Sequence, residues 1–241
     1  MFLSVIIPAY NEEKRIAKTL LAVDGFLRRQ TYEYEIIVVD DGSKDKTAEV
    51  VETLKNQVQN LKLIDEKVNH GKGWAVRRGM LEARGQYRMF MDADNSTTID
   101  QVINFLPYFN ESYDVVIGSR RIKGAVIAVK QSWVRDFLGG IFRLIVHRLV
   151  PLGVTDSQAG FKIFSQKAAE VIFKKQTIFR WAFDVEVLAI ARLLGFRIKE
   201  VPIYWVNDLE SHVKLSGMIK MLWEVWQVRL NLWGGKYKKY A

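Results

Sequence analysis

The order of apolar and polar residues predicts alternating strands and helices along the first half of the chain. Three short, β-branched apolar runs are typical of buried strands: residues 3–8, 35–39 and 61–65. Each is followed by a segment in which apolar residues recur at helical spacing: residues 14–29, 47–56 and 74–83. Three strand–helix alternations of this length predict a parallel α/β sheet of the nucleotide-binding kind.

The second half of the chain continues this pattern less regularly. We expect a helix that runs to Phe109 and begins with a capping box of Thr98 and Gln101. Another helix is expected to begin near Phe183 and to end at Gly195. Further strands are predicted at residues 114–118, at 197–205 and after the polar turn that ends at Gly160.

Two late helices, residues 133–150 and 216–233, have apolar faces wider than a single core contact needs. Their polar residues form narrow stripes: Asp136, Gly140, Arg143 and His147 in the first helix, and Lys220, Glu224, Gln227 and Asn231 in the second. Three tryptophans lie among the apolar positions of the second helix, and cationic residues flank both helices. This pattern suits helices that lie in a membrane interface. Packing on the sheet or against a partner chain is the alternative.

Composition narrows the class of protein and of partner. The chain has 241 residues, 49% of them hydrophobic, which suits one large α/β domain. Its net charge of +9 favours a polyanionic partner: nucleic acid, an anionic membrane or a phosphorylated substrate. Most of this charge lies between Gly118 and Val150, where seven cations accompany a single acid. The chain has no cysteine, which fits a cytosolic protein, and no signal peptide or run of about 20 apolar residues is evident.

Two aspartates at the end of an apolar run are the strongest candidates for chemistry. Asp92 and Asp94 directly follow residues 89–91, a predicted buried strand. Ligands of open α/β sheets bind at the carboxyl ends of the strands. Two carboxylates there could hold Mg²⁺ or Mn²⁺, which prefer oxygen ligands and share their remaining positions with phosphates. A solvated loop is the alternative for this short pattern.

A glycine–lysine segment precedes the third predicted helix. In residues 69–73, two glycines flank Lys72, so the backbone could approach an anion at the helix N-terminus. An ordinary glycine turn explains the segment equally well. The glycine fingerprints of dinucleotide-binding and P-loop proteins do not occur in the sequence.

Several segments, taken in order, resemble family 2 glycosyltransferases, which are inverting enzymes of GT-A fold. The family motifs are residues 5–12, 38–43, 69–73 and 92–94. Three further stretches are similar to the dolichyl-phosphate β-glucosyltransferase branch: residues 73–80, 156–162 and 180–186. The resemblance implies a mostly parallel central sheet with helices on both faces. It also implies a catalytic domain over residues 1–205, with an acceptor-facing and membrane-facing segment at about 119–152. Residues 206–241 would form an acceptor loop and a C-terminal amphipathic helix.

The resemblance also implies roles for individual residues. The nucleotide sugar would bind to Pro8, Tyr10, Asn11, Glu12, Asp40, Gly71, Lys72, Asp92, Ala93 and Asp94, with Asp92 and Asp94 at the metal. The acceptor phosphate would bind to Arg120 and Arg135, and the donor sugar would lie near Gln158, Asp184 and Glu186. Ser96 stands where the mannose-transferring branch has a glutamine metal ligand, so Asn95 or water would complete the shell. Residues 210–214 depart from the Gly-Ser-Lys of the glucose branch, which leaves the choice of donor open.

These roles predict an enzyme that transfers a sugar, with glucose from UDP-glucose favoured, to a polyprenyl or dolichyl phosphate. A phosphate monoester is largely dianionic at neutral pH because its second pKa is about 6, so it needs no general base. The forked guanidinium group of arginine suits phosphate, so the basic segment between Gly118 and Val150 would serve to bind the acceptor. An enzyme acting on a hydroxyl acceptor is the first alternative, and its base would be Asp156, Asp184 or Glu186. A catalytically silent nucleotide-sugar-binding protein is the second.

The expected partners follow from this reaction. They are the nucleotide sugar, the lipid phosphate and the inner, cytoplasmic face of a membrane, to which the chain would bind peripherally without a span of its own. Nucleic acid is not expected, because it would explain the net charge but not the aspartates at the strand ends. A homo-oligomer or a membrane-anchoring partner stays open.

Overall fold

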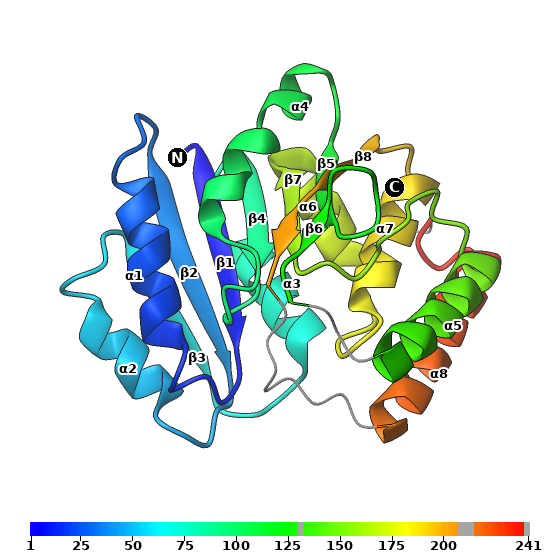
Figure 1. The fold of residues 1–241 in the computed structure, drawn as a ribbon, viewed down its shortest axis with the longest axis horizontal. Coiled ribbons are helices and arrows are strands. Elements are labelled where there is room, and N and C mark those ends of the chain that lie inside the picture. Colours follow the sequence, from blue (N-terminus) through cyan, green and yellow to red (C-terminus); the bar gives the residue numbers. More distant parts are fainter. Residues whose placement is uncertain (130–132, 207–214, 239–241) are drawn as a thin grey trace.

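A large mixed β-sheet forms the centre of the molecule (Figure 1). The computed structural model describes residues 1–129, 133–206 and 215–238. The strands are β1 (Leu3–Ala9), β2 (Tyr34–Asp41), β3 (Leu61–Glu66), β4 (Tyr87–Met91), β5 (Val115–Ser119), β6 (Val126–Ile127), β7 (Phe161–Ser165), β8 (Ile198–Pro202) and β9 (Tyr204–Trp205). The large sheet has seven strands in the order β3-β2-β1-β4-β7-β5-β8, and β6 pairs with β9 in a second sheet.

Helices connect most of the strands. They are α1 (Ile16–Leu27), α2 (Thr47–Leu54), α3 (Lys72–Glu82), the 3₁₀ helix η1 (Ile99–Asn104), α4 (Pro107–Asn110), α5 (Trp133–Leu149), α6 (Gln166–Lys175), α7 (Phe183–Leu193) and α8 (Leu215–Trp233). The three predicted strand–helix alternations are therefore confirmed as β1–α1, β2–α2 and β3–α3. Gly195, which follows α7, has a φ of +79°, as expected for a residue that ends a helix.

The direction of the strands confirms the predicted, mostly parallel central sheet. In the large sheet, β7 alone runs against its neighbours, β4 and β5, and the other pairs are parallel. Because β7 is reversed, its first residue lies at the same sheet edge as the last residues of β1, β4 and β5. Residues before β7 and residues after the parallel strands therefore meet at one edge.

Helices cover both faces of the sheet, as predicted, because successive strand residues point to opposite sides. Ile6 and Phe90 belong to the core beneath α3, α6 and α7. Val5 and Met89, their neighbours in the sequence, belong to the core beneath α1, α2 and η1. Helix α8 packs on α7 and α5 packs on α8, so these two helices extend the molecule at the end opposite α1 and α2 (Figure 1).

Two predictions of local structure are wrong. The expected helix to Phe109 is divided into η1 and α4, and Thr98 makes no capping bond with its side chain. Gln101 instead exchanges two hydrogen bonds with the backbone of Tyr204, at 2.9 and 2.8 Å, and so holds β9. The predicted strand over residues 197–205 is two strands, β8 and β9, in different sheets.

Some residues that were interpreted from the sequence lie outside the ranges that the structure describes. The segment 210–214, considered above for donor choice, lies in the undescribed range 207–214. Across the described parts of the chain, no helix combines the length and the apolar character needed to cross a bilayer.

Candidate active site

The ends of four strands bring most of the predicted site residues to one edge of the sheet. Tyr10 follows β1, Asp92 follows β4 and Arg120 follows β5. Gly160 immediately precedes the antiparallel strand β7, and the amide of Asp92 donates to its carbonyl oxygen at 3.2 Å. This edge is the ligand-binding side expected of an open α/β sheet.

Asp92 is held between a lysine and a glycine. The Nζ atom of Lys72, at the start of α3, forms a short ion pair with Asp92 Oδ1. The Asp92 carboxylate also lies directly over the Cα of Gly160, where any Cβ would overlap it. Burial opposes the charge of Lys72, but Asp92 and, next, Asp184 raise the pKa of Lys72 above its usual value. Gly160 is therefore required by the position of Asp92, and Lys72 is charged among several carboxylates.

Asp94 has the character of a metal ligand. Burial and then the neighbouring Asp92 carboxylate raise the pKa of Asp94, so a divalent cation would relieve an unfavourable charge pair. Its Oδ1 accepts the backbone N–H of Ser96 at 2.9 Å, which fixes the orientation of the carboxylate. Ser96 thus contributes to the site through its backbone N–H group, which holds the Asp94 carboxylate.

Asn95 and Glu12 are the polar neighbours of Asp92 and Asp94. Asn95 adopts a left-handed conformation with a φ of +56°, and its Oδ1 is buried without a partner. Burial raises the pKa of Glu12 despite its ion pair with Arg15, and the charges of Asp94 and Asp92 add to the shift. In the described part of the chain no three Asp, Glu or His side chains converge as metal ligands. Asp92 and Asp94 are the two carboxylates that could hold a cation, and two protein ligands leave positions for phosphate oxygens, as Mg²⁺ sites commonly do.

The loops expected to hold the nucleotide are tied to one another. The amide of Asn11 donates to Ser43 Oγ at 2.9 Å, and Asn11 Oδ1 accepts from the amide of Lys44 at 2.8 Å. Asp40 accepts the amide of Ser43 at 3.1 Å, and burial raises the pKa of Asp40. Of the other predicted residues, Tyr10 is exposed, whereas Pro8, Gly71 and Ala93 are buried.

The two glycines around Lys72 serve packing. A Cβ on Gly71 would come within 2.5 Å of the Phe179 carbonyl oxygen, and one on Gly73 would come within 2.5 Å of Phe183 Cβ. The glycines therefore let α3 approach the N-terminus of α7, where Asp184 lies. Asp41 organises the same loop by accepting the amides of His70 at 2.9 Å and Gly71 at 2.7 Å.

Arg120 is locked to Asp156. Its Nε and Nη2 atoms donate to the two carboxylate oxygens at 2.8 and 2.9 Å, and its guanidinium lies 5.2 Å from the Trp205 ring centroid. Burial opposes the charge of Asp156, but Arg120 overcomes this effect and lowers the pKa of Asp156 to about 2. Asp156 is therefore a poor general base, which contradicts its candidacy in the hydroxyl-acceptor alternative.

Asp184 forms a buried ion pair beneath this edge. Lys162, fully buried on β7, donates to Asp184 Oδ1 at 2.5 Å and to the carbonyl of Ala159 at 2.6 Å. Burial raises the pKa of Asp184, while Lys162 and Lys72 act in the opposite direction. Asp184 thus lies within the electrostatic reach of Lys72, but its carboxylate is engaged by Lys162.

Glu186 has a structural role that contradicts its predicted place beside the donor sugar. Its carboxylate is completely buried. It accepts hydrogen bonds from the amides of Thr177 and Ile178 at 2.9 and 2.7 Å, and from the Tyr237 hydroxyl at 2.7 Å. A carboxylate with these partners cannot contact a substrate, and it instead anchors the loop before α7 and the end of the chain.

Two further predicted residues lie on the side of α5 and α8. The Nε2 atom of Gln158 donates to the sulfur of Met221 on α8 at 3.3 Å. Arg135 is in the first turn of α5, but its side chain is outside the described part of the structure.

Four residues at or near the site were missed or underrated by the sequence analysis: Asp41, Gly160, Lys162 and Glu224. The Oε2 atom of Glu224, on α8, accepts the amides of Trp181 and Ala182 at 2.9 and 2.8 Å and so caps α7 from another helix. Lys162 carried one signal, a lysine inside a predicted buried strand. The partners of the other three are distant in the sequence and left no local pattern.

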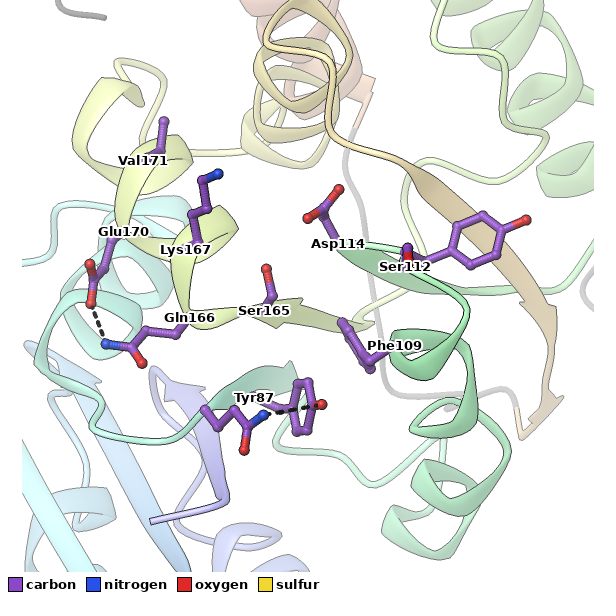
Figure 2. A pocket seen from close by; sticks show the side chains of 11 residues that line it. Tyr87, Phe109, Ser112, Asp114, Ser165, Gln166, Lys167, Glu170 and Val171 are labelled. Carbon is purple, nitrogen blue, oxygen red and sulfur yellow. Dashed lines mark hydrogen bonds between the residues drawn. The ribbon is translucent and has the colours of Figure 1, made fainter.

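A separate cavity lies at the opposite edge of the sheet. Figure 2 shows Tyr87 at the start of β4, Ser165 at the end of β7 and Asp114 just before β5 around a cavity of about 550 Å³. Gln166 donates to Glu170 in its wall at 3.0 Å. None of the predicted site residues lines this cavity, so it is distinct from the acidic edge described above.

Comparisons with known proteins agree with this geometry. A family model described as "Glycosyl transferase family 2" matches residues 4–173. The chain is 37% identical to dolichyl-phosphate beta-glucosyltransferase ALG5D of Trichomonas vaginalis, over 100% of this chain and 78% of that protein. It is 36% identical to dolichyl-phosphate beta-glucosyltransferase of Dictyostelium discoideum (99% and 77% covered) and 33% identical to that of Saccharomyces cerevisiae (99% and 77% covered).

Solved structures are similar in fold. Glucosyl-3-phosphoglycerate synthase from Mycobacterium tuberculosis, in complex with Mn²⁺, UDP-glucose and phosphoglyceric acid, superposes with a TM-score of 0.69. The match covers 97% of this chain and 80% of that one at 20% sequence identity. At this identity the likeness shows the shared fold alone.

Proposed function

Since this chain belongs to glycosyl transferase family 2 and is a glycosyltransferase, we propose that it transfers glucose from UDP-glucose to a dolichyl or other polyprenyl phosphate with inversion. The choice of a lipid phosphate as acceptor is supported by relatives named dolichyl-phosphate beta-glucosyltransferases. They are 37% and 36% identical to this chain over 100% and 99% of its length. The names of the same relatives support glucose as the sugar. UDP-glucose and Mn²⁺ are bound by a structural neighbour that shares the fold.

The observation that best supports a phosphate as the acceptor is how the three candidate general bases are bonded and buried. Asp156 is bonded to Arg120, Asp184 to Lys162, and Glu186 is completely buried. A sugar hydroxyl would require one of them to remove a proton in the transition state. A phosphate monoester with a second pKa of about 6 is already largely dianionic at neutral pH. The surroundings of these three carboxylates therefore favour an acceptor that must be held in position but need not be deprotonated.

Positive charge would position this acceptor. Asp156 occupies Nε and Nη2 of Arg120, so it fixes the guanidinium plane while other N–H groups of the side chain remain for a phosphate. We assign the acceptor phosphate to Arg120 together with Arg135. Bidentate arginine contacts suit phosphate better than the point charge of a lysine.

The donor would bind at the ends of β1, β2 and β4. Exposed Tyr10 would contact the base and Asp40 would bond the base or ribose, while Pro8, Asn11, Glu12 and Gly71 would lie beside the nucleotide. Asp92 and Asp94 would hold Mg²⁺ or Mn²⁺, which supplies Lewis-acid stabilisation of the diphosphate leaving group. Lys72 orients Asp92 and adds positive charge at the diphosphate. Gln158 would face the donor sugar.

The site of action proposed is the cytoplasmic surface of a membrane. A polyprenyl phosphate keeps its chain in the bilayer and presents its phosphate at the surface, so the protein must work at that surface. The absence of cysteine from the chain is compatible with a reducing compartment.

Transfer of labelled sugar into organic-extractable lipid tests the proposal. Purified protein receives polyprenyl phosphate, Mg²⁺ or Mn²⁺, and UDP-glucose, UDP-GlcNAc or GDP-mannose in parallel. We expect label in lipid from UDP-glucose and its loss in Asp94→Asn and Arg135→Ala. Asp100→Asn and Arg29→Ala, which change exposed residues of the same charges outside the proposed donor and acceptor sites, are matched controls that should retain transfer.

Two outcomes would contradict the proposal. Transfer to a soluble glycan that is indifferent to Arg135→Ala would indicate a hydroxyl acceptor. Binding of UDP-glucose without turnover on any acceptor would indicate a nucleotide-sugar-binding protein.

A further inference from the structure

Helix α8 is attached to the protein by its polar residues. Glu224 caps the N-terminus of α7, and Asn231 Nδ2 donates to Thr177 Oγ1 at 3.2 Å and to the Tyr237 hydroxyl at 3.1 Å. Val225 and Val228 are buried on the same side. The polar stripe that a surface helix normally presents to water is therefore partly turned inward.

The outward side of α8 is correspondingly apolar. Five of its large side chains are exposed: Ile219, Trp223, Trp226, Leu230 and Trp233. They recur at alternating spacings of four and three residues, so they form one continuous stripe along the helix. Ile141 and Leu144 of α5, which packs beside α8, are exposed as well. We call these seven residues the α5–α8 face.

The large exposed fractions of these side chains distinguish the α5–α8 face from apolar residues that are scattered singly over a protein surface. Ile219 is 64% exposed, Trp223 60%, Trp233 62% and Leu144 68%. A stripe of exposed apolar side chains along one helix, such as the one on α8, marks a site of interaction with a protein or a membrane. Figure 1 shows α5 and α8 together at one end of the molecule, and the exposed fractions show that other described residues leave these side chains uncovered.

Charge favours a lipid surface. Residues 139–149 and 215–238 contain six lysines or arginines and one acid, Glu224, which is directed at α7. The Arg229 guanidinium lies 4.2 Å from the Trp233 ring centroid, so a cation accompanies the aromatic stripe. Anionic lipid headgroups attract such basic segments by about 1 kcal/mol per residue.

The residue types distinguish a bilayer from a second copy of the chain. A helix–helix seam with this spacing normally uses Leu, Ile and Val, which interlock closely. Three of the five stripe positions of α8 are tryptophan. Tryptophan is concentrated at membrane–water interfaces, where its apolar ring and polar N–H meet matching surroundings.

We propose that the α5–α8 face docks into the interfacial layer of an anionic bilayer, with α8 lying parallel to the membrane plane. The link to catalysis rests on the proposed function. Glu224 bonds the loop before Asp184, and Met221 bonds Gln158. The docked helix thereby holds the active-site edge at a fixed position relative to the lipid surface.

Flotation with vesicles that contain no polyprenyl phosphate tests the docking directly. Vesicles of phosphatidylcholine, with and without phosphatidylglycerol, are mixed with wild type and with the double variant Ile219→Glu/Leu230→Glu, which keeps every tryptophan as a fluorescence reporter. We expect wild type to float with the anionic vesicles and its tryptophan emission to shift to the blue. The double variant should partition at least about tenfold more weakly.

A matched control places the same charges elsewhere. Leu21 on α1 and Ile103 on η1 are exposed apolar residues away from the α5–α8 face, so Leu21→Glu/Ile103→Glu should float like wild type. Thermal unfolding of all three proteins separates lost docking from lost folding. Should the double variant fail to fold, Trp223→Ser provides the milder change of the same face.

Three results would overturn the proposal. They are equal flotation of wild type and the folded face variants, no flotation of wild type, and a wild-type dimer that the face variants dissociate, which would assign the face to a second copy. Transfer to a short, water-soluble polyprenyl phosphate separates this inference from the proposed function. Folded face variants should retain that reaction and lose only transfer to acceptor in vesicles.

Discussion

Replacing Asp156 with asparagine should expose how strongly the Arg120–Asp156 pair holds the acceptor side of the site. The Asp156 carboxylate is 3% exposed and the Arg120 side chain 24% exposed, so the Asp156→Asn variant leaves a largely buried guanidinium without its counter-charge. Loss of one partner of a buried pair typically costs about 3–5 kcal/mol. Because Arg120 retains some contact with water, we expect about 3 kcal/mol at pH 7.

The pH dependence of this loss follows from the pKa of Asp156. That pKa falls from its usual value of 3.8 to about 2 in the folded protein. At about 1.4 kcal/mol per pH unit, the charged form contributes about 2 kcal/mol of stability at neutral pH. This contribution is complete above about pH 5 and is lost as the pH falls through the folded pKa of about 2. About half of it, roughly 1 kcal/mol, should be lost by pH 3.

Urea unfolding followed by tryptophan fluorescence at pH 7, 5, 4 and 3 provides the measurement. The difference between wild type and Asp156→Asn should narrow by about 1 kcal/mol from pH 7 to pH 3. Taking the difference removes the contributions of Asp40 and Asp94, whose raised pKa values act in the opposite direction in both proteins. Asp100→Asn, at an exposed acid, is the control. A difference that stays constant with pH would refute the assignment of the low pKa to this pair.

Three further changes test other contacts of the site. Gly160→Ala should displace Asp92 and lower transfer by about a hundredfold with little change in melting temperature; unchanged activity would contradict the contact. Asp94→Asn should weaken Mn²⁺ binding, measured by calorimetry with UDP, more than about tenfold. In wild type this binding should decline as the pH falls, beginning at a higher pH than for an ordinary aspartate, because the pKa of Asp94 is raised. Glu224→Ala should cost about 1–2 kcal/mol in urea unfolding by removing the α7 cap, and Glu224→Gln, which keeps an acceptor oxygen, should cost less.

The strand–helix alternation and the location of two aspartates at a strand end could be predicted from local sequence patterns. Buried strands such as residues 35–39 carry an apolar pattern that is local, so it can be read without the fold. The position of Asp92 and Asp94 at a strand end is local for the same reason. Motifs such as residues 156–162 further identified the family, because they preserve residue types in a fixed order.

The contacts of those residues could not be predicted, because they depend on how the chain folds. Asp156 was read as a candidate base and proved to be the partner of Arg120, 36 residues away, and Glu186 was read as a site residue and proved to anchor Tyr237. Glu224 belongs to the polar stripe of α8, whose contacts the sequence did not indicate, and it caps α7. Each of these contacts joins elements that are distant in the chain. A carboxylate has the same local pattern whether it meets water, a cation or a helix terminus, so folding alone sets its charge and its role.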